Sequence, residues 1–175
     1  ISKLQQESGY PYIVNVDTAN RSNPIDGKIV MSNLCSEILQ VQKPSLINDA
    51  QEFVKMGTDI SCNLGSTNIV NMMASPDFGR SIKAITRALT FVTDSSNIEA
   101  VPTIKNGNAQ AHTFGLGAMG LHSFLARNNI EYGSPESIEF TDIYFMLMNY
   151  WTLVESNNIA RERGESFVGF EKSKY

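Results

Sequence analysis

Cysteine and histidine are scarce in this chain, which has two of each among its 175 residues. Two cysteines are too few for the disulfide framework that supports small secreted domains. Cys35, Cys62, His112 and His122 also show none of the short ligand spacings that structural zinc sites use. The sequence therefore predicts a reduced, cytoplasmic protein without a metal site.

Positive charge is in short supply as well, because the formal net charge is -4 and no run of lysine and arginine is present. A nucleic-acid binder needs such a run to neutralise phosphates. Long apolar runs are lacking too. The longest candidate, residues 144–151, is interrupted by Asn149 and is much shorter than the roughly 18 residues of a membrane-spanning helix. We therefore expect neither a nucleic-acid partner nor a membrane partner.

The residues that are present suffice for a hydrophobic core. With 42% hydrophobic residues in 175, the chain is long enough for one ordinary globular domain. It starts at Ile1 rather than at methionine, so we expect a fragment of a longer protein. Its N-terminal part has extended patterns, which predict a short strand at residues 12–16 and extended segments at 28–38 and 59–70.

The C-terminal part has two helical patterns. Ser75 and Pro76 predict the N-cap and first residue of an amphipathic helix that runs to Val92. Ser134 followed by proline repeats this start signal, and the second pattern continues to Gly164. A helix of that length measures about 43 Å. We therefore expect it to pack along the outside of something larger.

Two features that resemble ligand sites have simpler explanations. Residues 115–120 match the G-x-G-x-x-G dinucleotide fingerprint, but polar, turn-like residues 106–112 stand where the fingerprint needs a buried strand. We expect these glycines to allow close helix packing instead. Glu155, Glu162 and Glu165 lack the Glu-x-x-His partners of a di-iron site, which favours a solvated helix face for them.

Three chemically active side chains surround the first cysteine. In an extended segment Asn33, Cys35 and Glu37 would project to one face, because alternate side chains share a face. One interpretation is an inert buried thiol between two polar residues. The other is a pocket in which a carboxylate, an amide and a thiol meet a small polar substrate. No histidine stands nearby, so a protease-type Cys–His pair is not indicated.

The segment Ser32–Ile38, SNLCSEI, resembles the active-site motif of the large (α) subunit of the aerobic ribonucleoside-diphosphate reductases. The resemblance covers the chain from about Tyr12 onward and is most similar to the bacterial class Ib branch. Further segments match the family in the same order: residues 62–68 (CNLGSTN), 112–117 (HTFGLG), 132–136 (YGSPE) and 160–165 (ARERGE).

The resemblance implies roles for the residues of this motif. Cys35 would be the thiyl-radical cysteine that abstracts the hydrogen from C3′ of the ribose. Glu37 would be the base on the 3′-hydroxyl and Asn33 the amide that binds the substrate hydroxyls, within a substrate-binding stretch that includes Leu34 and Ser36. Cys62 would be one of the two redox-active cysteines. Its upstream partner is missing from this chain.

The resemblance also implies a fold and partners. The fold would be α/β, part of a ten-stranded α/β barrel with the active-site loop threaded into it and a helix-rich C-terminal half, so that residues 1–175 form a single partial domain. No cofactor would bind this chain, because a small subunit with a dimetal-tyrosyl radical supplies the radical and nucleotide effectors bind elsewhere. The other partners would be a ribonucleoside diphosphate, a thioredoxin- or glutaredoxin-like reductant and a second copy of the parent. We expect the isolated fragment to be inactive.

Two other function classes remain open from the residues alone. The chain could be a thiol redox enzyme or sensor that uses Cys35, which requires a lowered thiol pKa. It could also be a helical interaction module whose cysteines are incidental. Neither class explains why several separate motifs match one family in order.

Overall fold

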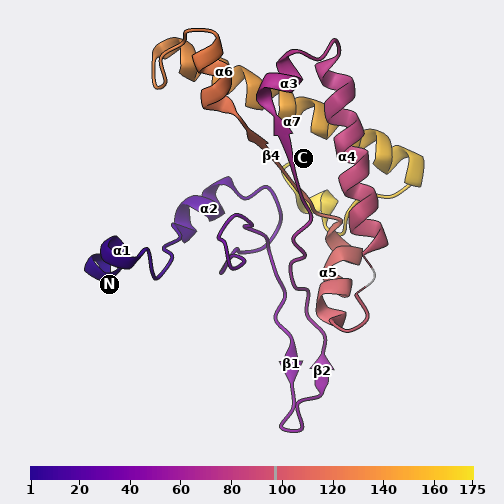
Figure 1. The fold of residues 1–175 in the computed structure, drawn as a ribbon. Coiled ribbons are helices and arrows are strands. Elements are labelled where there is room, and N and C mark those ends of the chain that lie inside the picture. The colour runs from indigo at the N-terminus through magenta and orange to yellow at the C-terminus, as the bar shows by residue number, and fades with distance from the viewer. Residues whose placement is uncertain (97) are drawn as a thin grey trace. The chain divides into compact units, whose positions relative to one another are not determined.

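The computed structural model describes residues 1–96 and 98–175 (Figure 1). The chain divides into two compact units. The first unit comprises residues 1–61, 98–111 and 167–175, and the second comprises residues 62–97 and 112–166. That residues 1–175 form one partial domain stays a prediction.

The first unit contains short helices and one hairpin. The helices are α1 (Ser2–Ser8), α2 (Val16–Ser22), α5 (Pro102–Ala111) and the 3-10 turn η1 (Phe170–Lys172). Strands β1 (Leu46–Ile47) and β2 (Phe53–Lys55) pair antiparallel, with Leu46 opposite Lys55. The hairpin turn is closed by Asn48, which exchanges main-chain and side-chain hydrogen bonds with Glu52.

The predicted strand at residues 12–16 is wrong, and the extended segment predicted at 28–38 forms no strand and is interrupted by a turn at 34–36. Residues 12–15 belong to no strand, and Val16 begins α2. The Asn20 side chain explains part of the difference, because it accepts from the N–H of Ile29 at 2.9 Å and donates to the Ile29 carbonyl at 2.8 Å. A side chain thus takes the main-chain bonds that a neighbouring strand would have made.

Helix α5 lies against the chain that leads toward the second cysteine. A Cβ on Gly107 would lie 2.1 Å from the Asp59 carbonyl oxygen, so only glycine permits this approach. The Thr103 hydroxyl donates to the Asp59 carboxylate at 2.5 Å, and the Asn106 amide donates to the Gly57 carbonyl at 2.8 Å. These bonds hold residues 57–59 on the helix.

The described residues of the second unit form one parallel strand pair and four helices. Strand β3 (Leu64–Asn68) pairs with β4 (Gly115–Met119), with Leu64 opposite Gly115 and Asn68 opposite Met119. The helices are α3 (Ile69–Met73), α4 (Phe78–Ser95), α6 (Leu121–Arg127) and α7 (Pro135–Arg163). The extended prediction for residues 59–70 is confirmed at β3, whereas Ile69 already begins α3.

Both long helices are confirmed. Helix α7 begins after the predicted N-cap Ser134, which accepts from Ser137 N at 3.2 Å, and ends at Gly164 with φ 71°. Helix α4 begins two residues later than predicted. Its N-cap is Asp77, which accepts from Arg80 N at 2.8 Å, rather than Ser75.

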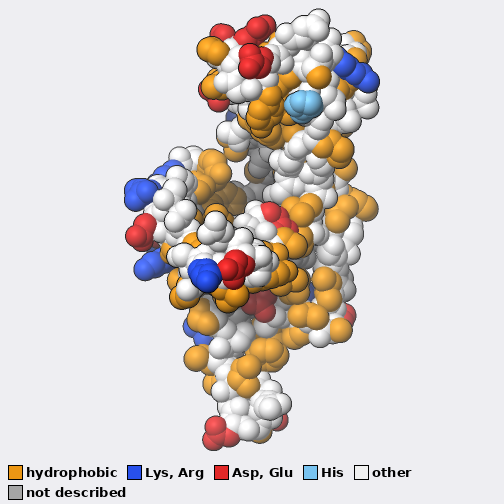
Figure 2. Space-filling view, turned by 60° about the vertical axis from the view of Figure 1, so that its left-hand side comes forward, with side chains coloured by type: hydrophobic (Ala, Val, Ile, Leu, Met, Phe, Trp, Pro, Cys, Tyr) orange, Lys and Arg blue, Asp and Glu red, His pale blue; other side chains and the backbone are white. Residues whose placement is uncertain are grey.

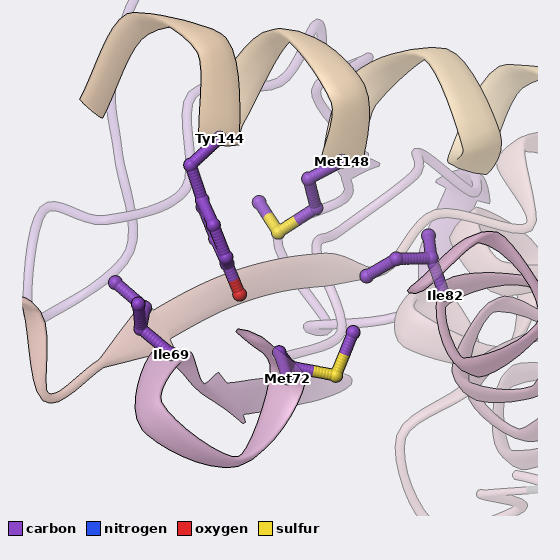
Figure 3. Close-up of a cluster of buried hydrophobic side chains, with 5 residues drawn as sticks. All are labelled: Ile69, Met72, Ile82, Tyr144 and Met148. Carbon is purple, nitrogen blue, oxygen red and sulfur yellow. The ribbon is translucent and has the colours of Figure 1, made fainter. Parts of the chain in front are cut away.

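The core of the second unit joins α3, α4 and α7. Figure 3 shows Tyr144 and Met148 pointing from α7 toward α3. The Tyr144 hydroxyl lies 3.0 Å from the Thr67 hydroxyl, which also donates to the Gly117 carbonyl at 3.3 Å. A buried tyrosine therefore has its polar end satisfied by the strand pair. The buried cluster consists of Ile69, Met72, Ile82, Tyr144 and Met148.

We expected the acidic residues of α7 to lie on a solvated helix face, and this prediction is wrong for Glu155. Its side chain is 5% exposed and contacts Arg87 Nε of α4, while Asn158 donates to it at 3.0 Å. Arg87 also binds Glu162 with two hydrogen bonds of 2.8 and 2.6 Å. Charged side chains thus join α4 to α7 over two turns of the longer helix.

The fold is α/β with a helix-rich C-terminal half, as predicted. Within the described residues the strands form two two-stranded sheets and no closed barrel. Large apolar side chains remain exposed, among them Val54 of β2 and Met146 of α7, and Figure 2 shows hydrophobic atoms spread over the face in view. None of the helices that the structure describes is both long and apolar enough to cross a membrane.

Candidate functional site

The segment around Cys35 is a tight turn, not a strand. Ser36 N donates to the Asn33 carbonyl at 3.1 Å, and Ser36 adopts a φ of 64°. A second hydrogen bond closes the turn, because Asn33 Oδ1 accepts from Ile38 N at 3.0 Å. The predicted alternation of side chains is therefore wrong here, since an asparagine side chain takes a main-chain donor that a strand would have used.

The turn presents the thiol to solvent. Leu34 is 87% exposed and Cys35 and Glu37 are exposed, whereas Asn33 is half-buried. The interpretation of Cys35 as an inert buried thiol is therefore wrong for this structure. The turn carries an amide, a thiol and a carboxylate within five residues, and the Asn33 side chain closes it.

One tyrosine that the sequence patterns did not single out, Tyr12, lies within electrostatic reach of Cys35. The rings of Tyr10 and Tyr12 stack with centroids 5.1 Å apart. The pKa of the Tyr12 phenol is raised above its ordinary value, first by its hydrogen bond with Tyr10, then by burial and by the charge of a Cys35 thiolate. Tyr12 stands 23 residues before Cys35 (35 − 12), so no local spacing signal connects them.

The second cysteine belongs to the other compact unit. Cys62 is exposed and lies on the segment that enters β3. The next residue, Asn63, donates from its side chain to Thr93 of α4 and accepts from Gly115 N with its carbonyl. The structure thus places Asn33, Cys35 and Glu37 in one turn and Cys62 on a separate, anchored segment.

The glycine-rich residues 115–120 do not pack two helices together, so that expectation is wrong. Residues 115–119 form β4, and Gly120 caps α6 with φ 82°. The segment 106–112, expected to be turn-like, is mostly the end of α5. A helix therefore precedes the glycines where a dinucleotide fold has a strand, and the fingerprint lacks its structural context.

The two histidines have protein neighbours. His112 Nδ1 lies 2.8 Å from the Asp94 carboxylate, which also binds Arg163, and His122 lies 6.1 Å from the Tyr132 ring. Burial alone would raise the pKa of Asp94, but the hydrogen bonds and charges of Arg163 and His112 outweigh it and lower that pKa. Throughout residues 1–96 and 98–175, no group of three or more acidic, cysteine or histidine side chains is arranged to hold a metal ion.

Comparison with known proteins gives a consistent result. The family model for the ribonucleotide reductase barrel domain matches residues 1–175. The ribonucleoside-diphosphate reductase subunit alpha of Mycoplasma pneumoniae is 48% identical over a match that covers 100% of this chain and 24% of the relative. The subunit of the same name from Bacillus subtilis is 41% identical, with 100% of this chain and 25% of the relative covered.

A solved structure has a similar fold. The alpha subunit of the class Id ribonucleotide reductase of Actinobacillus ureae matches with a TM-score of 0.75 and 24% identity, over 94% of this chain and 31% of that one. The chain spans about a quarter of the length of the curated relatives it matches.

Proposed function

This chain belongs to the family of ribonucleotide reductase barrel domains, and we propose that it supplies the catalytic core of a ribonucleoside-diphosphate reductase. One observation carries the proposal. A chain that matches this family over its whole length presents an exposed thiol, Cys35, on a turn between an amide and a carboxylate. The assignment to the class Ib branch stays a prediction.

The proposed chemistry uses the three residues of the turn. Cys35, as a thiyl radical, takes the hydrogen atom from C3′ of the ribose and later returns one. Glu37 accepts the proton of the 3′-hydroxyl, which helps the 2′-hydroxyl to leave as water. Asn33 uses Oδ1 inside the turn, so its Nδ2 end is the donor that it would offer to a substrate hydroxyl.

Cys62 is proposed to supply reducing electrons together with a second thiol of the full-length protein. In the balanced reaction a ribose C–OH and two thiols give a C–H bond, one disulfide and one water. The two sulfurs lose two electrons, which reduce the ribose carbon. Cys62 and Cys35 cannot serve each other as the redox pair, because that disulfide would consume the radical site.

The remaining partners belong to the same proposal. They are a small subunit with a dimetal-tyrosyl radical, a thioredoxin- or glutaredoxin-like reductant, and a second copy of the parent, with nucleotide effectors bound outside these residues. A cytoplasmic location also stays a prediction. In the complete protein, β3 and β4 would be strands of a ten-stranded barrel whose missing strands cover their edges.

The deciding experiment is reduction of a ribonucleoside diphosphate by the full-length protein, with the family's small radical subunit and dithiothreitol. We expect Cys35→Ser to abolish deoxynucleotide formation, because serine cannot form the sulfur radical. Met31→Leu, a volume-conserving change at an exposed neighbouring position, is the control and should keep the wild-type rate. Substantial turnover by Cys35→Ser would refute the proposal, and turnover by residues 1–175 alone would refute the expected inactivity of the fragment.

The exposure of Cys35 also fits a thiol redox enzyme or sensor. Such a protein would use the thiolate, so its alkylation rate would level off below the pH at which an ordinary thiol ionises. A radical cysteine needs no thiolate at rest. Iodoacetamide labelling of Cys35 against pH therefore separates the two functions.

A further inference from the structure

The buried hydroxyl of Thr93 contacts Asn63, the residue that follows Cys62. The Asn63 Nδ2 donates to Thr93 Oγ1 at 3.0 Å. Thr93 is 1% exposed on α4, and its hydroxyl is also within hydrogen-bond distance of the carbonyls of Leu89 at 3.1 Å and Thr113 at 3.2 Å. The Thr93 hydroxyl thus accepts a hydrogen bond from Asn63, just before β3, and can donate one to the carbonyl of Thr113, just before β4.

Asn63 is held through its main chain as well. Gly115 N, at the start of β4, donates to the Asn63 carbonyl at 2.9 Å. The residue after Cys62 is therefore fixed at two points, by a buried side chain of α4 and by the first residue of the neighbouring strand. Cys62 itself remains exposed.

An exposed thiol beside an anchored residue suits a group that must meet another sulfur in a defined place. A disulfide requires an S–S distance of about 2.05 Å and Cα atoms about 4.4 to 6.8 Å apart. A cysteine on a loose segment would spend most of its time outside that range, which lowers its effective concentration toward the partner thiol. The anchor at Asn63 reduces this loss.

We propose that Thr93 is a positioning residue that, through Asn63, holds Cys62 in the place where it forms its disulfide. The proposal rests on the proposed function in taking Cys62 as a redox cysteine. It adds two residues that the sequence motifs did not mark for a role in the reduction step. Thr93 stands 31 residues after Cys62 (93 − 62), so only the packing of α4 on the strand pair connects them.

The test compares the full-length protein with its Thr93→Val variant, which keeps the shape of the side chain and removes the hydroxyl. Each protein is equilibrated in mixtures of oxidised and reduced dithiothreitol, the remaining thiols are alkylated, and the Cys62 peptide is quantified by mass spectrometry. We expect the equilibrium constant for Cys62 disulfide formation to fall by about three- to tenfold, as expected for the loss of one net hydrogen bond. The substrate KM should stay unchanged, because no substrate contact is removed.

Three controls separate positioning from general loosening. Thr93→Ser keeps the hydroxyl and should return the constant to within about twofold of wild type. Asn63→Ala should cause the same loss as Thr93→Val, and the double variant should lose no more than either single variant, because both remove one contact. The alkylation rate of Cys35, measured on its own peptide in the same samples, should not change.

Several results would overturn the inference. One is an unchanged equilibrium constant for Cys62 disulfide formation in Thr93→Val, and another is a Thr93→Ser variant that loses as much as Thr93→Val. The others are additive losses in the double variant and a parallel change in the alkylation rate of Cys35. A wild-type Cys62 that stays reduced across the whole series would overturn it too. The disulfide and alkylation measurements, unlike the KM, need no turnover, so failure here is distinguishable from failure of the Cys35→Ser test.

Discussion

The Arg87→Met variant tests how much the charged contact between α4 and α7 stabilises the second unit. In the structure Arg87 contacts Glu155, whose side chain is 5% exposed, and binds Glu162 with two further hydrogen bonds. Methionine keeps much of the length of the side chain and removes its charge. Among the residues that the structure describes, the remaining donor to Glu155 would then be Asn158, a neutral amide at 3.0 Å.

The expected cost follows from the burial of the two partners. Removing one member of a fully buried ion pair costs about 3 to 5 kcal/mol, because the other charge stays buried without compensation. Because water reaches Arg87, which is 46% exposed, we take a lower figure of about 2 kcal/mol for the Glu155 carboxylate that is left buried. At 1.4 kcal/mol per factor of ten, this corresponds to a roughly 30-fold change in the opening equilibrium of these helices.

Amide hydrogen exchange in the full-length protein measures that opening directly. Peptides from α4 and the second half of α7 should exchange roughly 30-fold faster in Arg87→Met. Adding Glu155→Gln should restore most of the protection, because an amide costs less to bury than a carboxylate. Lys105→Met, which breaks the exposed ion pair with Glu99, is the matched control. It should change the exchange rate of the same α4 and α7 peptides by less than about fivefold. Protection within about threefold of wild type in Arg87→Met would refute the reasoning.

Three further predictions concern packing, a buried hydroxyl pair and pH. Gly79→Ala should destabilise the second unit by about 1 to 3 kcal/mol in denaturant unfolding, because its Cβ would lie 2.6 Å from the Trp151 ring; an unchanged midpoint would contradict this. Tyr144→Phe should cost about 1 kcal/mol by the same measurement, and no loss would show that the contact with Thr67 is energetically neutral. The pKa of the Asp94 carboxyl is lowered in the folded chain, so the ionised carboxylate stabilises the fold. This stabilisation is fully present above the ordinary pKa of 3.8 and is lost as pH falls through the lower pKa of the folded chain. Stability measured against pH should therefore fall in that acid range, and an Asp94→Asn variant should fall less.

Both long helices were predictable because their signals are local. Ser134 and Gly164 mark the two ends of α7 by capping and by a positive φ, which depend on neighbouring residues alone. The N-cap of α4 was misplaced by two residues because Ser75 and Asp77 are both good caps, and main-chain geometry decides which one accepts from the first turn.

The strands were harder to predict because asparagine side chains compete with the main chain. Asn20 bonds both main-chain groups of Ile29, and Asn33 closes the turn through Ile38 N, in segments whose residue types suit strands. Periodicity records which side chains are apolar, but not which main-chain donors a side chain will take. Periodicity likewise cannot show that Tyr12 and Cys35, which are 23 residues apart, interact electrostatically in the fold.

The sequence by itself determined the family and the candidate chemistry, because the motif that holds Asn33, Cys35 and Glu37 and four further segments match one family in the same order. It also determined the long helices, whose hydrogen bonds connect residues four apart. Only the tertiary structure decided that Cys35 is exposed, that Glu155 is buried against Arg87, and that Thr93 holds the segment of Cys62. The last two contacts join residues 68 and 30 positions apart, and such contacts depend on how whole elements pack.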